Sequence, residues 1–159
     1  MWKNSIFPKN QSFSASLIVY REGFEMYKNC DELKQILEKK NFQKRIDDLA
    51  KKYTGKKILG YGTGVLAEVI LNNYDISKLD IIGFADSKYL YDQEDFKNYK
   101  TYSPDQIKDA NPDLIILFVY NDIDIKEFFK DNYPEIKIPL VPVISRSFLE
   151  KIRMLLLGC

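Results

Sequence analysis

Residues 57–73 read KILGYGTGVLAEVILNN, a short apolar run followed by alternating glycines and then by a second, longer apolar segment. The run at 57–61 has the composition of a buried strand, and residues 65–73 have the length and composition of a helix. The glycines between them predict a tight turn that joins the strand directly to the helix. Since a strand, a turn and a helix in this order begin an α/β unit, this stretch decides the fold class.

The alternation of strands and helices continues along the chain. We expect further strands at 79–85, 114–119 and 136–144, and helices at 123–130 and 147–157. Residues 114–119 are free of charged side chains, which is typical of a central strand covered on both faces. Pro139 and Pro142 cannot donate ladder hydrogen bonds and therefore predict an edge position for the last strand. The sequence thus predicts an α/β fold: a small parallel sheet of strand order 2-1-3-4, counting these four strands, flanked by helices.

The N-terminal third of the chain predicts a helical extension. Apolar residues recur at spacings of three and four from Asp31 to Tyr53, which indicates an amphipathic helix. A step of five after Leu37 interrupts the period and predicts a break near Asn41. Residues 12–20, SFSASLIVY, are compatible with one strand. We therefore divide the chain into an N-terminal segment with the amphipathic helix (1–54), the α/β domain (55–145) and a C-terminal helix (146–159).

The sequence around Ser103 predicts one more short helix. Ser103 is followed by proline at the first helical position and by Gln106 at the third, which together form a capping box. Residues 87–102, before this helix, form a long loop with four tyrosines that could cover a ligand at the strand ends.

Composition excludes several classes of protein. The 159 residues include 24 Lys and Arg against 23 Asp and Glu, so no overall field attracts nucleic acid. The chain has no histidine, and its two cysteines, Cys30 and Cys159, form no CxxC pair, so we expect no metal site. No apolar run approaches the length of a membrane span, and no signal peptide is recognisable. We expect a cytoplasmic protein with reduced cysteines.

The glycine turn carries the main functional signal. Read from Gly62, the segment is G-x-G-x-x-A, the dinucleotide-type fingerprint, with Ala67 as the small residue that allows close packing of helix and sheet. The main-chain amides of residues 62–65, which include Thr63, Gly64 and Val65, would then face an anion, most naturally a phosphate. Asp86 ends the next strand about 20 residues further on, where the fingerprint has an acid for ribose hydroxyls. The acid repels a 2′-phosphate and favours UDP-like or NAD-like ligands over NADP.

Three more residues join this candidate site because of their position. Ser87 follows Asp86, and Tyr120 and Asn121 leave the strand at 114–119 at its carboxyl end. Ligands of open α/β sheets bind at that edge, so these residues are candidates for specificity. Asn121 also suits a plain structural role as the cap of the next helix.

The stretches ILGYGTGVLAEVIL, LDIIGFADSK and SPDQIKDANPDLIILFVYND resemble the small Rossmann-like domains that precede bacterial sugar acyltransferases and occur in other surface-polysaccharide biosynthesis proteins. The resemblance covers about residues 56–143. It implies that Gly62, Thr63 and Gly64 bind the phosphates of a nucleotide sugar and that Asp86 meets the nucleoside. Those acyltransferases carry a catalytic histidine in hexapeptide repeats, and this chain has neither, so acyl transfer is not implied.

The leading interpretation is a nucleotide-binding or nucleotide-sugar-binding module for sugar or surface-polysaccharide biosynthesis, working as a homo-oligomer or with a separate catalytic subunit. Catalytic residues stay unassigned, and a UDP-sugar or NAD is the expected ligand. An NAD-dependent oxidoreductase shares the fingerprint. An S-adenosylmethionine-dependent methyltransferase would share the glycines, but the acid those enzymes place before the first glycine is Ile58 here. A non-catalytic scaffold protein is the third alternative.

Overall fold

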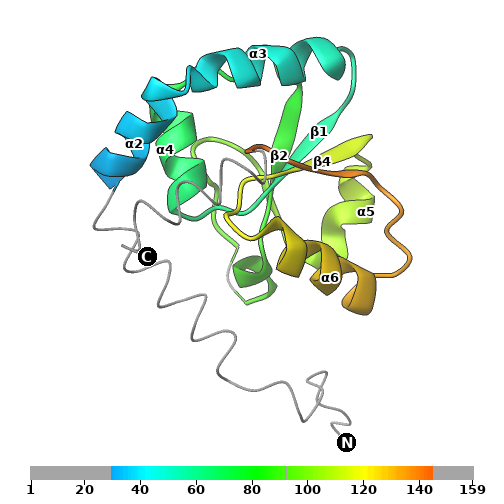
Figure 1. The fold of residues 1–159 in the computed structure, drawn as a ribbon. Helices are drawn as coiled ribbons and strands as arrows, with labels where there is room; N and C mark the ends of the chain where they lie inside the picture. Colours follow the sequence, from blue (N-terminus) through cyan, green and yellow to red (C-terminus); the bar gives the residue numbers. More distant parts are fainter. Residues whose placement is uncertain (1–29, 92, 145–159) are drawn as a thin grey trace, which may run out of the picture.

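The computed structural model describes residues 30–91 and 93–144, so the strand expected at 12–20 and the helix expected at 147–157 lie outside the described residues. Within the described residues, the chain first forms two helices and then alternates strands and helices (Figure 1). The helices are α2 (Cys30–Lys39), α3 (Phe42–Lys52), α4 (Val65–Asn73), η1 (Ser87–Leu90), η2 (Pro104–Gln106), α5 (Ile107–Ala110) and α6 (Asp122–Asn132). The strands are β1 (Ile58–Tyr61), β2 (Ile81–Ala85), β3 (Thr101–Tyr102), β4 (Leu114–Leu117) and β5 (Leu140–Pro142).

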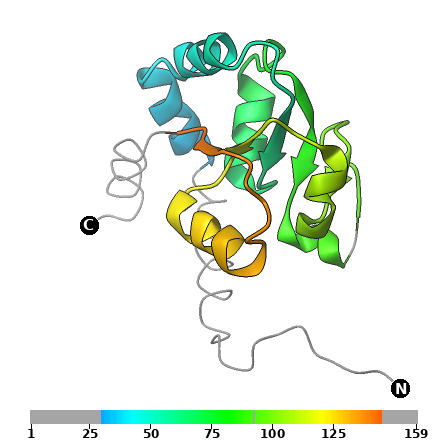
Figure 2. The same cartoon turned by 90° about the vertical axis from the view of Figure 1, so that its right-hand side faces the viewer.

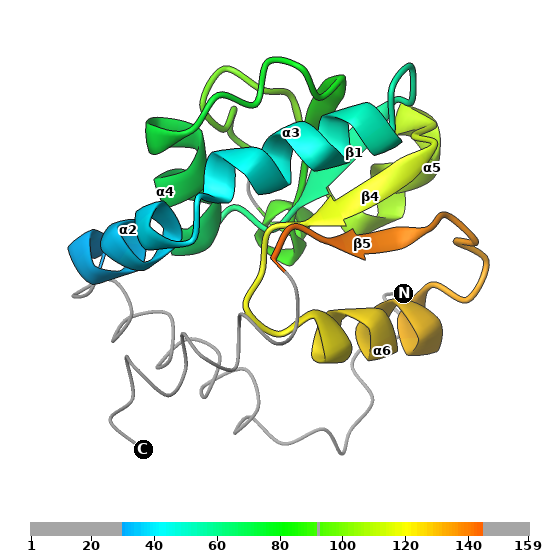
Figure 3. The same cartoon turned by 45° about the horizontal axis from the view of Figure 1, so that its top comes forward.

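The strands form one parallel sheet of order β3-β2-β1-β4-β5, and Figure 3 shows β1, β4 and β5 side by side. The predicted α/β class is confirmed. The four expected strands correspond to β2-β1-β4-β5, which is the predicted order 2-1-3-4. Strand β3, which was not predicted, adds an edge beyond β2. The last strand is shorter than the expected 136–144 but lies at the predicted edge.

Helices cover both faces of the sheet (Figures 1 and 2). Side chains of β1 and β4 alternate between two apolar clusters, as the period of a strand requires. Ile58 and Ile116 pack with α2, α3 and α4 on one face, and Leu59 and Leu117 pack with α5 and α6 on the other. Every residue of β1 and β4 is buried, which explains why their sequences are almost entirely apolar.

The predicted helical extension is two helices that join at Asn41. Its φ of 50° lies in the left-handed region, which asparagine tolerates better than most residues. The break restores the helical phase: Leu37 in α2 and Ile46 in α3 are both fully buried against the sheet. The predicted interruption near Asn41 is therefore confirmed.

The tyrosine-rich loop packs mainly on the domain itself. Lys97 and Asn98, both with positive φ, make a tight turn that brings Phe96 and Tyr99 together. Their rings contact the ring of Phe84 with centroids 5.3 and 5.2 Å apart. Of the four tyrosines in the loop, Tyr91 alone is largely exposed, at 78%.

Candidate functional site

The glycine turn lies at the carboxyl edge of the sheet, between the ends of β2 and β4. Parallel strands all end at the same edge, so the residues after β1, β2 and β4 meet there. The amide of Gly62 donates to the carbonyl of Ala85 (2.9 Å), and the amide of Phe118 donates to the carbonyl of Tyr61 (2.7 Å). The sheet order changes direction at β1, which makes this edge the topological switch point predicted from the sequence.

Gly62 is required by the path of the backbone. Its φ is +99°, and a Cβ added there would lie 2.6 Å from Cγ1 of Val119 and 2.9 Å from the carbonyl oxygen of Phe118. Only glycine combines this φ with so close an approach to the end of β4. The first glycine of the fingerprint therefore has a structural role in making the turn.

Gly64 differs from Gly62 in both respects. It is exposed, its φ of −83° and ψ of −164° are open to any residue, and among the described residues an added Cβ would meet no heavy atom within 4 Å apart from its chain neighbours. It is the N-cap of α4, and no side chain caps that helix in the described ranges. The small residue here thus leaves open space beside the uncapped amides at the start of α4.

Asp86 turns its carboxylate toward the glycine turn. Its Oδ2 accepts hydrogen bonds from the amide (2.9 Å) and the hydroxyl (3.0 Å) of Thr63, and its Oδ1 accepts from the amide of Lys88 (3.1 Å). The structure therefore brings Thr63 and Asp86 into direct contact. It also corrects one expectation: the amides of Gly62 and Thr63 are bonded within the chain, so anion binding by amides would begin at Gly64.

Ser87 bonds to a residue that the sequence analysis did not single out. Its Oγ lies 3.0 Å from the hydroxyl of Tyr61, the last residue of β1. Tyr61 is 3% exposed, and burial is the main cause that raises the pKa of its phenol. The unbroken apolar run of β1, which Tyr61 ends, was the signal that could have placed the Tyr61 ring inside the domain.

Tyr120 and Asn121 lie at the carboxyl end of β4, as predicted. Asn121 is the N-cap of α6: its side chain accepts from the amide of Asp124 (3.3 Å) and donates to the Asp124 carboxylate. This is the structural role that the sequence left open for it. The hydroxyl of Tyr120 is buried with no hydrogen-bond partner in the described part of the chain, and burial raises the pKa of its phenol.

Helices α4 and α6, which follow β1 and β4, therefore differ at their N-termini. The first turn of α6 carries Asp122 and Asp124 in addition to the Asn121 cap, so carboxylates already offset the positive end of its dipole. Among the described residues, no side chain caps the start of α4, and the Cβ position of Gly64 faces open space. An anion at this edge would bind α4 rather than α6.

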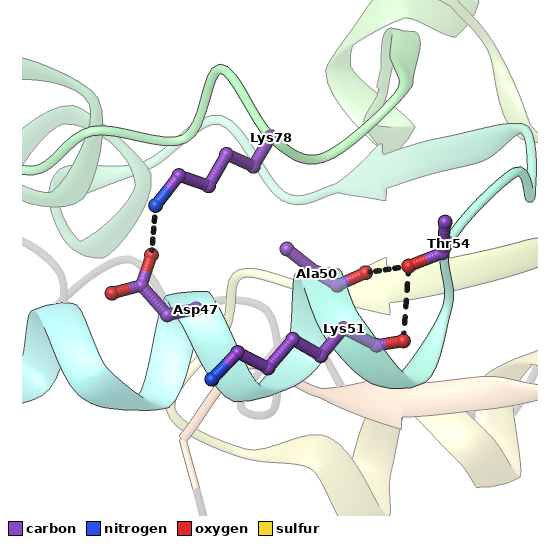
Figure 4. Close-up of a pocket in the computed structure, with 5 residues that line it drawn as sticks. All are labelled: Asp47, Ala50, Lys51, Thr54 and Lys78. Carbon is purple, nitrogen blue, oxygen red and sulfur yellow. Dashed lines mark hydrogen bonds and ion pairs between the residues drawn. The ribbon is translucent and has the colours of Figure 1, made fainter.

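A hollow lies away from the glycine turn, between α3 and the loop that precedes β2 (Figure 4). Its volume is about 270 Å³, and it is lined by Asp47, Ala50, Lys51, Thr54 and Lys78. Lys78 pairs with Asp47 at 3.1 Å, and the hydroxyl of Thr54 bonds to the last carbonyls of α3. Since the negative end of a helix dipole points here, we do not assign a phosphate to this hollow.

Comparison of the chain with family models, with curated proteins and with solved structures found no match. Residues 30–91 and 93–144 contain no group of three or more histidine, cysteine or acidic side chains arranged to hold a metal ion. None of the helices in these same ranges is long and apolar enough to cross a membrane.

Proposed function

We propose that the chain binds a nucleotide or nucleotide sugar at the carboxyl edge of its sheet. The observation that carries this proposal is the start of α4 at the switch point, where no side chain of residues 30–91 or 93–144 caps the amides and the Cβ position of Gly64 faces open space. Such an N-terminus attracts a phosphate through free N–H groups and the positive end of the helix dipole. The amides of Gly64 and Val65 hold the phosphate in this proposal.

Asp86 supports a nucleotide rather than a simple anion. Its carboxylate is hydrogen-bonded to Thr63, the residue that precedes Gly64 in the turn. A free phosphate gains nothing from a neighbouring carboxylate, whereas a ribose hydroxyl can donate to it. The same negative charge disfavours a 2′-phosphate, so we propose UDP-sugars or NAD rather than NADP as ligands.

Among the described residues, Lys88 is the lysine nearest to Asp86 along the chain, and its Nζ lies over the rings of Tyr89 and Phe96, 5.1 and 5.9 Å from their centroids. In this proposal the phosphate binds through neutral main-chain amides. We propose that the site serves sugar or surface-polysaccharide biosynthesis as a binding module, with a separate catalytic subunit supplying the chemistry.

A thermal-shift panel tests the proposal. The chain is heated with a UDP-amino sugar, NAD, NADP and S-adenosylmethionine in turn, because a ligand at about 100 times its Kd stabilises the native state by about 2.7 kcal/mol. We expect a rise of several degrees with the UDP-sugar. A rise with NAD alone favours the oxidoreductase, a rise with S-adenosylmethionine alone favours the methyltransferase, and no rise with any ligand contradicts nucleotide binding and favours a scaffold protein.

The matched variant for this panel is Gly64→Leu. Its side chain would enter the open space at the start of α4 and block a phosphate from the amides. We expect the variant to lose the ligand-dependent rise while its melting temperature without ligand changes little. An unchanged rise would mean that the ligand binds elsewhere.

A further inference from the structure

The carboxylate of Asp86 has little accepting capacity left. Oδ2 accepts from the amide and the hydroxyl of Thr63, and Oδ1 accepts from the amide of Lys88. A carboxylate oxygen offers about two lone-pair positions. Oδ2 is therefore filled, and one position remains, on Oδ1.

We propose that Thr63 is a positioning residue that fixes Asp86 and limits it to one of the two ribose hydroxyls of a nucleotide. The inference rests on the proposed nucleotide-binding function and adds its mode of recognition. A ribonucleotide presents a 2′-hydroxyl and a 3′-hydroxyl side by side, and a carboxylate with both oxygens free could accept from both. With Oδ2 held by Thr63, the Asp86 carboxylate accepts from one of them.

The surroundings of Thr63 make this arrangement rigid. Thr63 is 3% exposed, so no solvent competes for its hydroxyl. Its amide and its hydroxyl hold the same oxygen, and the amide of Lys88 holds the other, so the carboxylate plane is fixed from two sides. An acceptor fixed in advance loses less entropy when the ligand binds.

Two substitutions separate the hydroxyl of Thr63 from its shape. Thr63→Val keeps the branched side chain and removes the donor, whereas Thr63→Ser keeps the donor and removes a methyl group. Because Thr63→Val nearly keeps the volume of this buried side chain, an effect seen in Thr63→Val and absent in Thr63→Ser reports the hydroxyl.

The experiment is calorimetric titration of the full chain and both variants with UDP, 2′-deoxy-UDP and 3′-deoxy-UDP, and with the matching ADP series. In the wild-type chain we expect one deoxy analogue to bind about tenfold more weakly, as for a lost hydrogen bond to a charged group, and the other to bind as well as the parent. We expect Thr63→Val to bind the parent nucleotide severalfold more weakly and to bind the weaker analogue with unchanged affinity. Thr63→Ser should bind each ligand like the wild-type chain.

Three results would overturn the inference while nucleotide binding stands. These are equal losses for both deoxy analogues in the wild-type chain, an equal loss for all ligands in Thr63→Val, and a Thr63→Ser variant that behaves like Thr63→Val. If the wild-type chain binds no member of either series, the proposed function fails and this inference fails with it.

Discussion

Alanine substitutions at Gly62 and Gly64 should lower the free energy of unfolding by very different amounts. At Gly62, alanine would adopt a φ of +99°, and its Cβ would lie 2.6 Å from Val119 and 2.9 Å from the carbonyl oxygen of Phe118. A left-handed backbone at a residue with a Cβ costs about 1–2 kcal/mol, and overpacking costs about 1–3 kcal/mol more. We expect Gly62→Ala to lower the free energy of unfolding by about 2–5 kcal/mol.

At Gly64 the same substitution meets an allowed backbone conformation and open space. The loss of a good N-cap residue costs up to about 1 kcal/mol, and the lower entropy of the unfolded chain offsets about 0.4–1 kcal/mol of it. We expect Gly64→Ala to change the free energy of unfolding by less than about 1 kcal/mol. Urea unfolding followed by circular dichroism at the helical band measures both variants against wild type.

The contrast between the two variants tests the geometry of the turn. A Gly62→Ala chain as stable as wild type would show that the turn does not approach the end of β4 as described. A Gly64→Ala chain that loses as much stability as Gly62→Ala would show that the start of α4 is packed against something. In that case the open space on which the proposed site depends does not exist.

Three further predictions concern the rest of the domain. Phe84→Ala should lower the free energy of unfolding by about 3–5 kcal/mol, because Phe84 is fully buried and contacts Phe96 and Tyr99. Amide hydrogen exchange at residues 96–99 should become faster in this variant. Unchanged exchange there would contradict the packing of this loop on Phe84. Arg45→Met should lower the free energy of unfolding by about 1 kcal/mol, because the guanidinium of Arg45 donates hydrogen bonds of 3.2 Å to two carbonyls at the end of β5. An unchanged midpoint of urea unfolding would refute this contribution. Burial, together with neighbouring carboxylates, raises the pKa of Tyr133 to about 12, whereas a tyrosine in an unfolded chain ionises near pH 10. The stability that comes from the neutral phenol is therefore fully present below about pH 10 and is lost as the pH rises through about 12, so urea unfolding at pH 9 and pH 11 should show a drop that Tyr133→Phe reduces.

The sheet could be predicted from the sequence because its central strands are buried on both faces. Residues 58–61 and 114–117 have to be apolar at every position, which makes them visible as runs. Strand β3 was missed because it has two residues, Thr101 and Tyr102, which are too few to show any period. Its position depends on pairing with β2, and no local pattern encodes that pairing.

Only those features of the site that depend on backbone conformation and strand order could be predicted from the sequence. The glycines and the acid after β2 follow from turn geometry and topology, so Gly62, Gly64 and Asp86 could be placed at one edge. The hydrogen bond from Thr63 to Asp86 and the one between Tyr61 and Ser87 depend on side-chain rotamers that the surrounding packing selects. The spacing of residues in the sequence does not determine these rotamers. It therefore did not predict that the Thr63 amide is hydrogen-bonded to Asp86.

The most direct test of the proposed site is an amide-resolved titration. The chain labelled with ¹⁵N is titrated with UDP, and the chemical shifts of its backbone amides are followed. We expect saturable shifts centred on Gly64 and Val65, with the largest changes at the start of α4. Shifts confined to other regions, such as the hollow beside Lys51 and Lys78, or the absence of any saturable shift, would contradict the proposed site.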